Sequence, residues 1–174
     1  DIPLVVDPVM VATSGDRLLS PDAATAYKTE LFPRAMLVTP NLPEAAALLG
    51  TNVAASEDEA VGQARAIAAF GSRAVLVKGG HGQGATAVDI LVSGETVVQL
   101  AAPRIETQHT HGTGCTLSAA IAALLAVGEP LENAVRRAKA YVSAAIAAGR
   151  DIGVGRGNGP VDHLYAIRRA PPAV

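Results

Sequence analysis

Short apolar runs rich in Val, Leu and Ile recur through the first half of the chain, and each ends at a polar residue. Leu4-Val5-Val6 is followed by Asp7, a second run over 35–39 ends at Thr39, and a third over 73–78 ends at Lys78. Such runs are typical of strands that are buried on both faces of a parallel sheet. In open parallel sheets ligands bind at the carboxyl ends of the strands, so these polar residues are the first candidates for a site.

Segments with helical spacing separate and follow the strand-like runs. Ser20 and Pro21 are a plausible cap and first-turn residue, Gly50 is a natural terminator, and Ser56 with Glu59 has the spacing of a capping box. The predicted helices are residues 22–31, 43–49, 57–70, 114–127 and 131–148.

Alternation of apolar and polar residues appears in only one part of the chain. Residues 85–92 and 96–100 alternate around Ser93-Gly94-Glu95, which predicts an antiparallel pair joined by a turn. The order of elements predicts an α/β fold, with a mostly parallel central sheet, helices on both faces and a small antiparallel edge. We expect residues 1–174 to form a single domain.

Composition narrows the class of protein. The 174 residues are 49% hydrophobic and 17% charged, enough apolar content for a packed core. A net charge of -2 argues against a nucleic-acid surface, and no apolar run approaches the about 20 residues that cross a membrane. Cys115, the single cysteine, excludes an internal disulfide and suits a cytoplasmic location. Because the chain opens with a strand of the buried type, we expect it to lack an upstream part.

The strongest candidate for chemistry is Thr110-His111-Gly112-Thr113-Gly114-Cys115-Thr116, directly before an Ala-rich predicted helix. Glycines allow a tight turn and close approach of a ligand, while the helix directs unpaired N–H groups and its positive end toward that turn. The pattern favours a phosphate site. Read alone, it also fits a tight loop with Cys115 as a small core residue.

Two further candidates lie at predicted strand ends. Asn41 and Glu44 could hold Mg²⁺ through oxygen ligands, and the same spacing fits a capping box. Asp7 needs a cation or donors if it is buried, and Lys78 suits a phosphate. An ion pair between Asp7 and Lys78 is the simpler alternative.

Together these segments resemble the phosphomethylpyrimidine kinase family of the ribokinase-like superfamily. The similarity covers nearly the whole chain and rests on five stretches: Asp7-Pro8-Val9-Met10-Val11-Ala12 with Ser14-Gly15, Thr39-Pro40-Asn41-Leu42-Pro43-Glu44, Lys78-Gly79-Gly80-His81, His111-Gly112-Thr113-Gly114-Cys115-Thr116-Leu117-Ser118, and Gly155-Arg156-Gly157-Asn158-Gly159-Pro160-Val161.

The resemblance implies a kinase that uses ATP and Mg²⁺ to phosphorylate 4-amino-5-hydroxymethyl-2-methylpyrimidine and then its monophosphate, in thiamine biosynthesis. It implies that Gly112, Thr113 and Gly114 form an anion hole and that Cys115 is the catalytic base. It further assigns Glu44 and Asn41 to the metal motif. Asp7, Lys78 and Thr110 are expected near the phosphates.

The resemblance also implies a homodimer, with the pyrimidine and ATP as partners and neither nucleic acid nor membrane. Family members have a substantial part before the strand that opens this chain, and that part supplies much of the pyrimidine pocket. Three alternatives stay open: pyridoxal kinase, a thiazole kinase with Cys at the same place, and a non-catalytic nucleotide-binding fragment.

Overall fold

The computed structural model describes residues 2–10, 19–81, 84–153 and 157–168. Within it the chain forms two compact units, Asp1–Arg104 and Ile105–Val174. The expected single domain stays a prediction. Of the segments that suggested the family, Val11, Ala12, Ser14 and Gly15 lie outside the described residues, as do Gly155 and Arg156.

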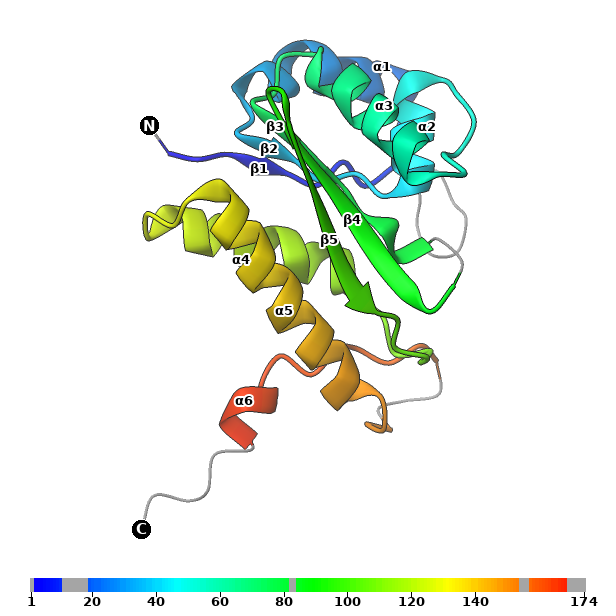
Figure 1. Ribbon diagram of the computed structural model, residues 1–174, viewed down its shortest axis with the longest axis vertical. Coiled ribbons are helices and arrows are strands. Elements are labelled where there is room, and N and C mark those ends of the chain that lie inside the picture. The colour runs from blue at the N-terminus through cyan, green and yellow to red at the C-terminus, as the bar shows by residue number, and fades with distance from the viewer. Residues whose placement is uncertain (1, 11–18, 82–83, 154–156, 169–174) are drawn as a thin grey trace. The chain divides into compact units, whose positions relative to one another are not determined.

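The first unit is built on a five-stranded sheet whose strands lie in chain order (Figure 1). Its strands are β1 (Val5–Val6), β2 (Leu37–Val38), β3 (Ala74–Val77), β4 (Thr86–Ser93) and β5 (Thr96–Pro103). The first three strands are parallel, and the β4–β5 hairpin adds two antiparallel pairings. The predicted α/β class is confirmed, and the antiparallel part, expected as a small edge, contains the longest strands.

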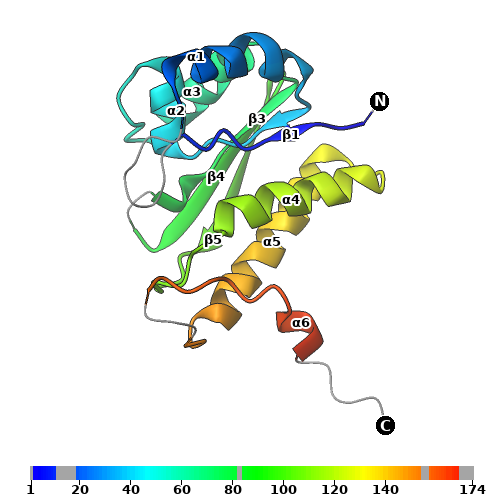
Figure 2. The same ribbon diagram turned by 180° about the vertical axis from the view of Figure 1, so that it is seen from behind.

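Three helices of the first unit lie together on one side of its sheet in both views (Figures 1 and 2). They are α1 (Pro21–Ala26), α2 (Leu42–Leu49) and α3 (Glu57–Ala68). The core between helices and sheet consists mainly of Ala, Val, Leu and Ile, with Phe32 as its one fully buried ring among the described residues.

The segment after α1 departs from the prediction of one regular helix over 22–31. Residues Tyr27–Leu31 form a π-helical turn, and Phe32–Arg34 continue as a 3₁₀ turn. The Phe32 N–H donates to the carbonyl of Tyr27, five residues earlier, and the two rings stack with centroids 6.0 Å apart. The wider turn shifts the following residues by one position around the helix and accompanies the burial of Phe32.

The start of α3 corrects one predicted detail. The Ser56 hydroxyl accepts a hydrogen bond from the Glu59 N–H at 3.2 Å, as a capping box requires. The Glu59 carboxylate, however, accepts from the N–H of Ala55 at 2.7 Å rather than from that of Ser56. Its side chain reaches one residue farther back, so only half of the predicted box forms.

The second unit contains α4 (Thr113–Ala126), α5 (Leu131–Gly149) and the short α6 (Tyr165–Arg168). The two long helices agree with the prediction within one residue, and they lie side by side in both views (Figure 2). The pattern did not predict α6, which has only four residues and too little sequence to show a period. No described helix is long and apolar enough to cross a membrane.

Candidate functional site

A compact group of polar side chains lies where the parallel strands of the first unit end. Its members are Asp7, Thr39, Asn41, Glu44 and Lys78. The backbone brings them together, because β1, β2 and β3 are adjacent and parallel, and Asn41 and Lys78 form a further parallel bridge just beyond the strands. The structure therefore assembles the strand-end residues that the sequence singled out in this unit.

Asp7 and Lys78 form the ion pair that was the simpler alternative. Lys78 Nζ lies 2.6 Å from Asp7 Oδ1, and each side chain is 13% exposed. The hydroxyl of Thr39, a fully buried residue, donates to the same Asp7 oxygen at 3.2 Å. This pairing does not exclude a role toward phosphate, since the ammonium group has three N–H donors and stays partly exposed.

Glu44 shares the same ammonium group at a longer distance. Its Oε2 lies 3.9 Å from Lys78 Nζ and accepts the Asn41 N–H at 2.7 Å, while the Glu44 N–H donates to Asn41 Oδ1 at 2.8 Å. The predicted capping box of α2 is thus complete. Burial raises the pKa of the Glu44 carboxyl above its ordinary value, against the lowering effects of the Asn41 N–H and of Lys78.

The charges and donors of this group fit a hard divalent cation. Asp7 and Glu44 offer carboxylate oxygens and Lys78 alone opposes them, so the ionised group has one more negative charge than positive. Mg²⁺ prefers oxygen ligands and keeps several waters, which suits a carboxylate beside nucleotide phosphates. The side-chain oxygen of Asn41 is engaged in the cap, so the carboxylate is the better ligand of the predicted pair.

The turn before α4 in the second unit has the geometry expected of an anion site. Gly112 precedes the helix with φ 82°, a left-handed conformation that favours glycine, and it provides no side-chain cap for the first N–H groups. The first turn of α4 contains no acidic residue, whereas α1, α2 and α5 each have one there and α3 has three. The positive end of this helix is therefore not neutralised by its own first turn.

The predicted residues of the turn have distinct positions. The N–H and hydroxyl of Thr113 both donate to the carbonyl of Thr110, at 3.2 and 2.7 Å, so Thr110 closes the turn through its backbone. Cys115 lies in the first turn of α4 and is exposed, which contradicts a role as a core residue. An exposed thiol at a helix start is accessible to a substrate.

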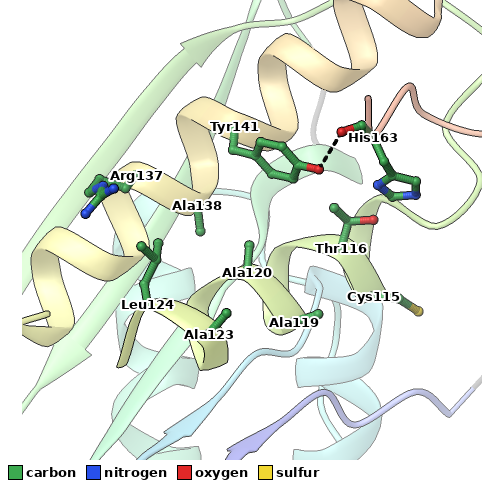
Figure 3. A pocket seen from close by; sticks show the side chains of 10 residues that line it. All are labelled: Cys115, Thr116, Ala119, Ala120, Ala123, Leu124, Arg137, Ala138, Tyr141 and His163. Carbon is green, nitrogen blue, oxygen red and sulfur yellow. Dashed lines mark hydrogen bonds between the residues drawn. The ribbon is translucent and has the colours of Figure 1, made fainter. Parts of the chain in front are cut away.

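An open apolar pocket of about 680 Å³ extends from Cys115 along the second unit (Figure 3). Small side chains of α4 form one wall, and α5 contributes Tyr141, whose hydroxyl donates to the His163 carbonyl at 3.1 Å. Arg137, the one arginine among the lining residues, is paired with Glu129. The sequence did not suggest this pocket, because Ala-rich helix faces occur equally in ordinary cores.

Sequence reasoning also missed two charged residues that contact the glycines after Lys78. Asp89 is 6% exposed in β4 and accepts a hydrogen bond from the Gly79 N–H, while Arg104 donates to the carbonyls of Gly80 and Gly84. The available signal was a carboxylate inside the apolar alternation of 85–92, where a charge needs partners.

Comparisons with known proteins agree on one family. The profile described as phosphomethylpyrimidine kinase matches residues 1–162. The hydroxymethylpyrimidine/phosphomethylpyrimidine kinase of Rhizobium meliloti is 58% identical over 161 residues, which are 92% of this chain and 60% of the relative. The chain thus spans about 60% of the length of such relatives.

Solved structures of two kinds of kinase share the fold. The pyridoxal kinase of Staphylococcus aureus in complex with AMP-PCP matches with a TM-score of 0.86 and 37% identity, covering 96% of this chain and 59% of that one. The phosphomethylpyrimidine kinase of Clostridium difficile matches with a TM-score of 0.68 and 38% identity, covering 83% and 58%.

Proposed function

The chain belongs to the phosphomethylpyrimidine kinase family, and from that premise we propose that it is part of an ATP-dependent kinase of thiamine biosynthesis. The kinase phosphorylates 4-amino-5-hydroxymethyl-2-methylpyrimidine and then the monophosphate. The observation that carries the proposal is the group of Asp7, Glu44 and Lys78 at the ends of adjacent parallel strands. Its combination of one cation and two carboxylates suits the binding of phosphates together with a metal ion.

In the proposed reaction the residues of the first unit bind and orient the nucleotide. The Lys78 ammonium group donates to phosphate oxygens, and Asp7 keeps it in place at 2.6 Å. Glu44 would hold Mg²⁺ through water, with Asn41 orienting the carboxylate. Bound Mg²⁺ would neutralise charge on the phosphates during transfer.

The residues of the second unit supply an anion site and a base. Backbone N–H groups of Gly112 and Gly114 stabilise negative charge on the transferred phosphoryl group, while the N–H and hydroxyl of Thr113 donate to the Thr110 carbonyl and keep the turn closed. The thiolate of Cys115 takes the proton from the hydroxymethyl oxygen as that oxygen attacks the terminal phosphorus of ATP. The new P–O bond forms, the bond to ADP breaks, and ADP leaves.

A second acceptor deserves testing because of a specific observation. The match to the pyridoxal kinase of Staphylococcus aureus has a TM-score of 0.86 at 37% identity, higher than the 0.68 of the phosphomethylpyrimidine kinase structure. Pyridoxal also has a hydroxymethyl group on a nitrogen heterocycle, so the same transfer applies. The relative at 58% identity favours the pyrimidine.

The remaining expectations about the whole protein belong to this proposal. We place the kinase in the cytoplasm as a homodimer that binds only small molecules. The single cysteine is compatible with that location.

A coupled assay of ADP release tests the function. The hydroxymethylpyrimidine and pyridoxal are offered in parallel, with ATP and Mg²⁺, to this chain and to a version extended upstream to the length of the relatives. We expect turnover of the pyrimidine by the extended version. Turnover of pyridoxal alone would show that the proposed pyrimidine substrate is wrong. No turnover of either acceptor would contradict the proposed kinase activity and favour the alternative of a non-catalytic, nucleotide-binding protein.

A further inference from the structure

The described residues between Lys78 and β4 include three glycines, Gly79, Gly80 and Gly84, and each of them accepts or donates a hydrogen bond with a charged side chain. Lys78, Gly79 and Gly80 come directly after β3, and Gly84 precedes β4. Glycine has more backbone freedom than any other residue, so such a segment needs external contacts to hold one conformation. The position of the Lys78 ammonium group depends on that conformation.

Asp89 fixes the segment at its first peptide. Its side chain is buried in β4, and Oδ1 accepts the Gly79 N–H at 2.8 Å. A Cβ atom on Gly79 would lie 1.8 Å from the carbonyl oxygen of Val88, so the backbone presses directly against β4. On the other side the Lys78 N–H donates to the Pro40 carbonyl at 2.8 Å. The peptide that bears Lys78 is therefore held between two neighbouring strands.

Arg104 fixes the segment at two later points. Its Nη1 donates to the Gly80 carbonyl at 2.6 Å and its Nε donates to the Gly84 carbonyl at 2.8 Å. Its own N–H donates to the Ala85 carbonyl at 2.8 Å, which anchors the arginine backbone beside β4. A planar guanidinium group can hold two carbonyls at a fixed separation, and a lysine at this place could not.

We propose that Asp89 and Arg104 are positioning residues that set the reach of the Lys78 ammonium group toward Asp7 and the phosphates. The proposal rests on the proposed function and deepens it. Asp89 and Arg104 contact the backbone of the residues after Lys78, whereas the Lys78 side chain contacts Asp7 and Glu44. They act through the backbone: by holding the peptide of Lys78 in place, they keep its ammonium group in position to bind phosphate.

A double-mutant cycle tests this inference in the kinase assay, with Arg104→Ala, Asp89→Ala and Lys78→Ala alone and in pairs. Displacement of a phosphate-binding group by about 1 Å can cost up to about 10²-fold in rate. We expect Arg104→Ala and Asp89→Ala to lower kcat by about 10-fold to 10²-fold with a smaller change in the KM for ATP. In the Lys78→Ala background the same changes should cost less than about threefold. Full additivity in both pairs would overturn the proposal.

Two further measurements keep the result clear if one variant folds poorly. Arg104→Lys retains the charge but cannot hold both carbonyls, so it should resemble Arg104→Ala, whereas recovery of kcat would contradict the positioning role. The control is Arg136→Ala, which removes an exposed arginine paired with Glu132 on α5 and should leave kcat unchanged.

Hydrogen exchange separates this inference from the proposed function. Arg104→Ala should speed exchange at the Lys78 and Gly79 amides, which donate to the Pro40 carbonyl and to Asp89, while leaving the amides of α3 unchanged. Unchanged exchange at Lys78 and Gly79 would overturn the inference even in an active kinase. A parent protein that phosphorylates neither acceptor would overturn the function, and faster exchange would still support the positioning of Lys78.

Discussion

Glu44 is the residue whose ionisation should influence stability most directly. Burial raises the pKa of its carboxyl above the ordinary value of 4.5, so the folded chain binds this proton more tightly than the unfolded chain does. Its contribution to stability is therefore complete below pH 4.5 and is lost as the pH rises through the folded pKa.

Glu44→Gln should remove this dependence and keep the cap, because the amide oxygen of Gln can still accept the Asn41 N–H. We expect the variant to gain stability relative to the parent as the pH rises above 4.5. Urea unfolding at a series of pH values measures this. If the free energy of unfolding changed with pH in the same way for both proteins, burial of Glu44 would have no effect on the pH dependence of stability.

Cys115 offers a test of the proposed base. Cys115→Ala should lower kcat by about 10²-fold to 10⁴-fold, the usual contribution of a positioned base, while ATP binding measured by calorimetry changes little. The thiol is exposed in the first turn of α4, so its removal leaves no cavity. Equal losses in turnover and in nucleotide affinity would count against the assignment.

The sequence indicated some residues of the candidate site and missed others for a physical reason. Asp7 and Lys78 were visible because each ends an apolar run, and Gly112 because two glycines precede a helix. Asp89 and Arg104 lie within or just after the hairpin strands, where a side chain's partners depend on which backbone passes beside it. That neighbour comes from elsewhere in the chain, and no local pattern records it.

At the scale of helices, two caps of similar chemistry allow a matched comparison. Asn41 caps α2 and Ser56 caps α3, each by accepting an N–H three residues later. Asn41→Ala and Ser56→Ala should each destabilise the chain by about 0.5–2 kcal/mol in urea unfolding.

The two variants should differ in the kinase assay. Asn41→Ala removes the partner of the Glu44 N–H and loosens the proposed metal ligand, so kcat should fall at limiting Mg²⁺. Ser56→Ala should retain the parent kcat, because Ser56 contacts none of the charged group. If both caps proved equal in activity, Asn41 would be only structural.

The C-terminal segment of the second unit holds the loop before α4 through one close contact. The Gly159 N–H donates to His109 Nδ1 at 2.8 Å, and the His111 N–H donates to the Gly159 carbonyl at 3.2 Å. A Cβ atom on Gly159 would lie 2.3 Å from His109 Nδ1. This contact therefore depends on glycine.

Gly159→Ala should displace the segment and expose the His111 amide to hydrogen exchange. Loss of the part-buried hydrogen bond to His109 should cost about 0.5–1.5 kcal/mol in unfolding free energy. Gly157→Ala is the control, because a Cβ atom there meets nothing within 4 Å. Identical exchange in the two variants would show that Gly159 does not hold the loop.

Most helices and strands followed from the sequence, and the exceptions have local causes. The π-helical turn over Tyr27–Leu31 keeps the same apolar spacing as a regular helix, so periodicity could not separate the two. The carboxylate of Glu59 reached Ala55 because a flexible side chain chooses between adjacent N–H groups. The π-helical turn and the partner of Glu59 are each decided by small differences in energy between local geometries. The spacing of apolar residues does not record such differences.

For the whole molecule, the predicted fold class is confirmed, whereas the single domain stays a prediction. Alternation of strands and helices along the chain is enough to predict an α/β sheet, and this prediction does not depend on how other parts of the chain pack. The boundary between the two units falls after Arg104, at the end of β5, without a run of Pro, Gly or charged residues to mark it. Composition alone therefore suggested one domain.

The ion pair between Asp7 and Lys78 has a consequence for the order of folding. It joins residues 71 positions apart, whereas the β4–β5 hairpin closes between Ser93 and Thr96. Hairpins form in about 1–10 μs, and contacts between distant residues form later because more chain must be ordered first. The pair should therefore be absent from the folding transition state.

Stopped-flow kinetics can show this order. Asp7→Ala should speed unfolding and leave the refolding rate nearly unchanged, whereas Gly94→Val, in the hairpin turn at φ 56°, should slow refolding. If Asp7→Ala refolded more slowly than the parent, the ion pair between Asp7 and Lys78 would already be formed in the folding transition state. In the expected order, the contact that holds the ammonium group also sets how long the sheet survives once formed, without affecting how fast it assembles.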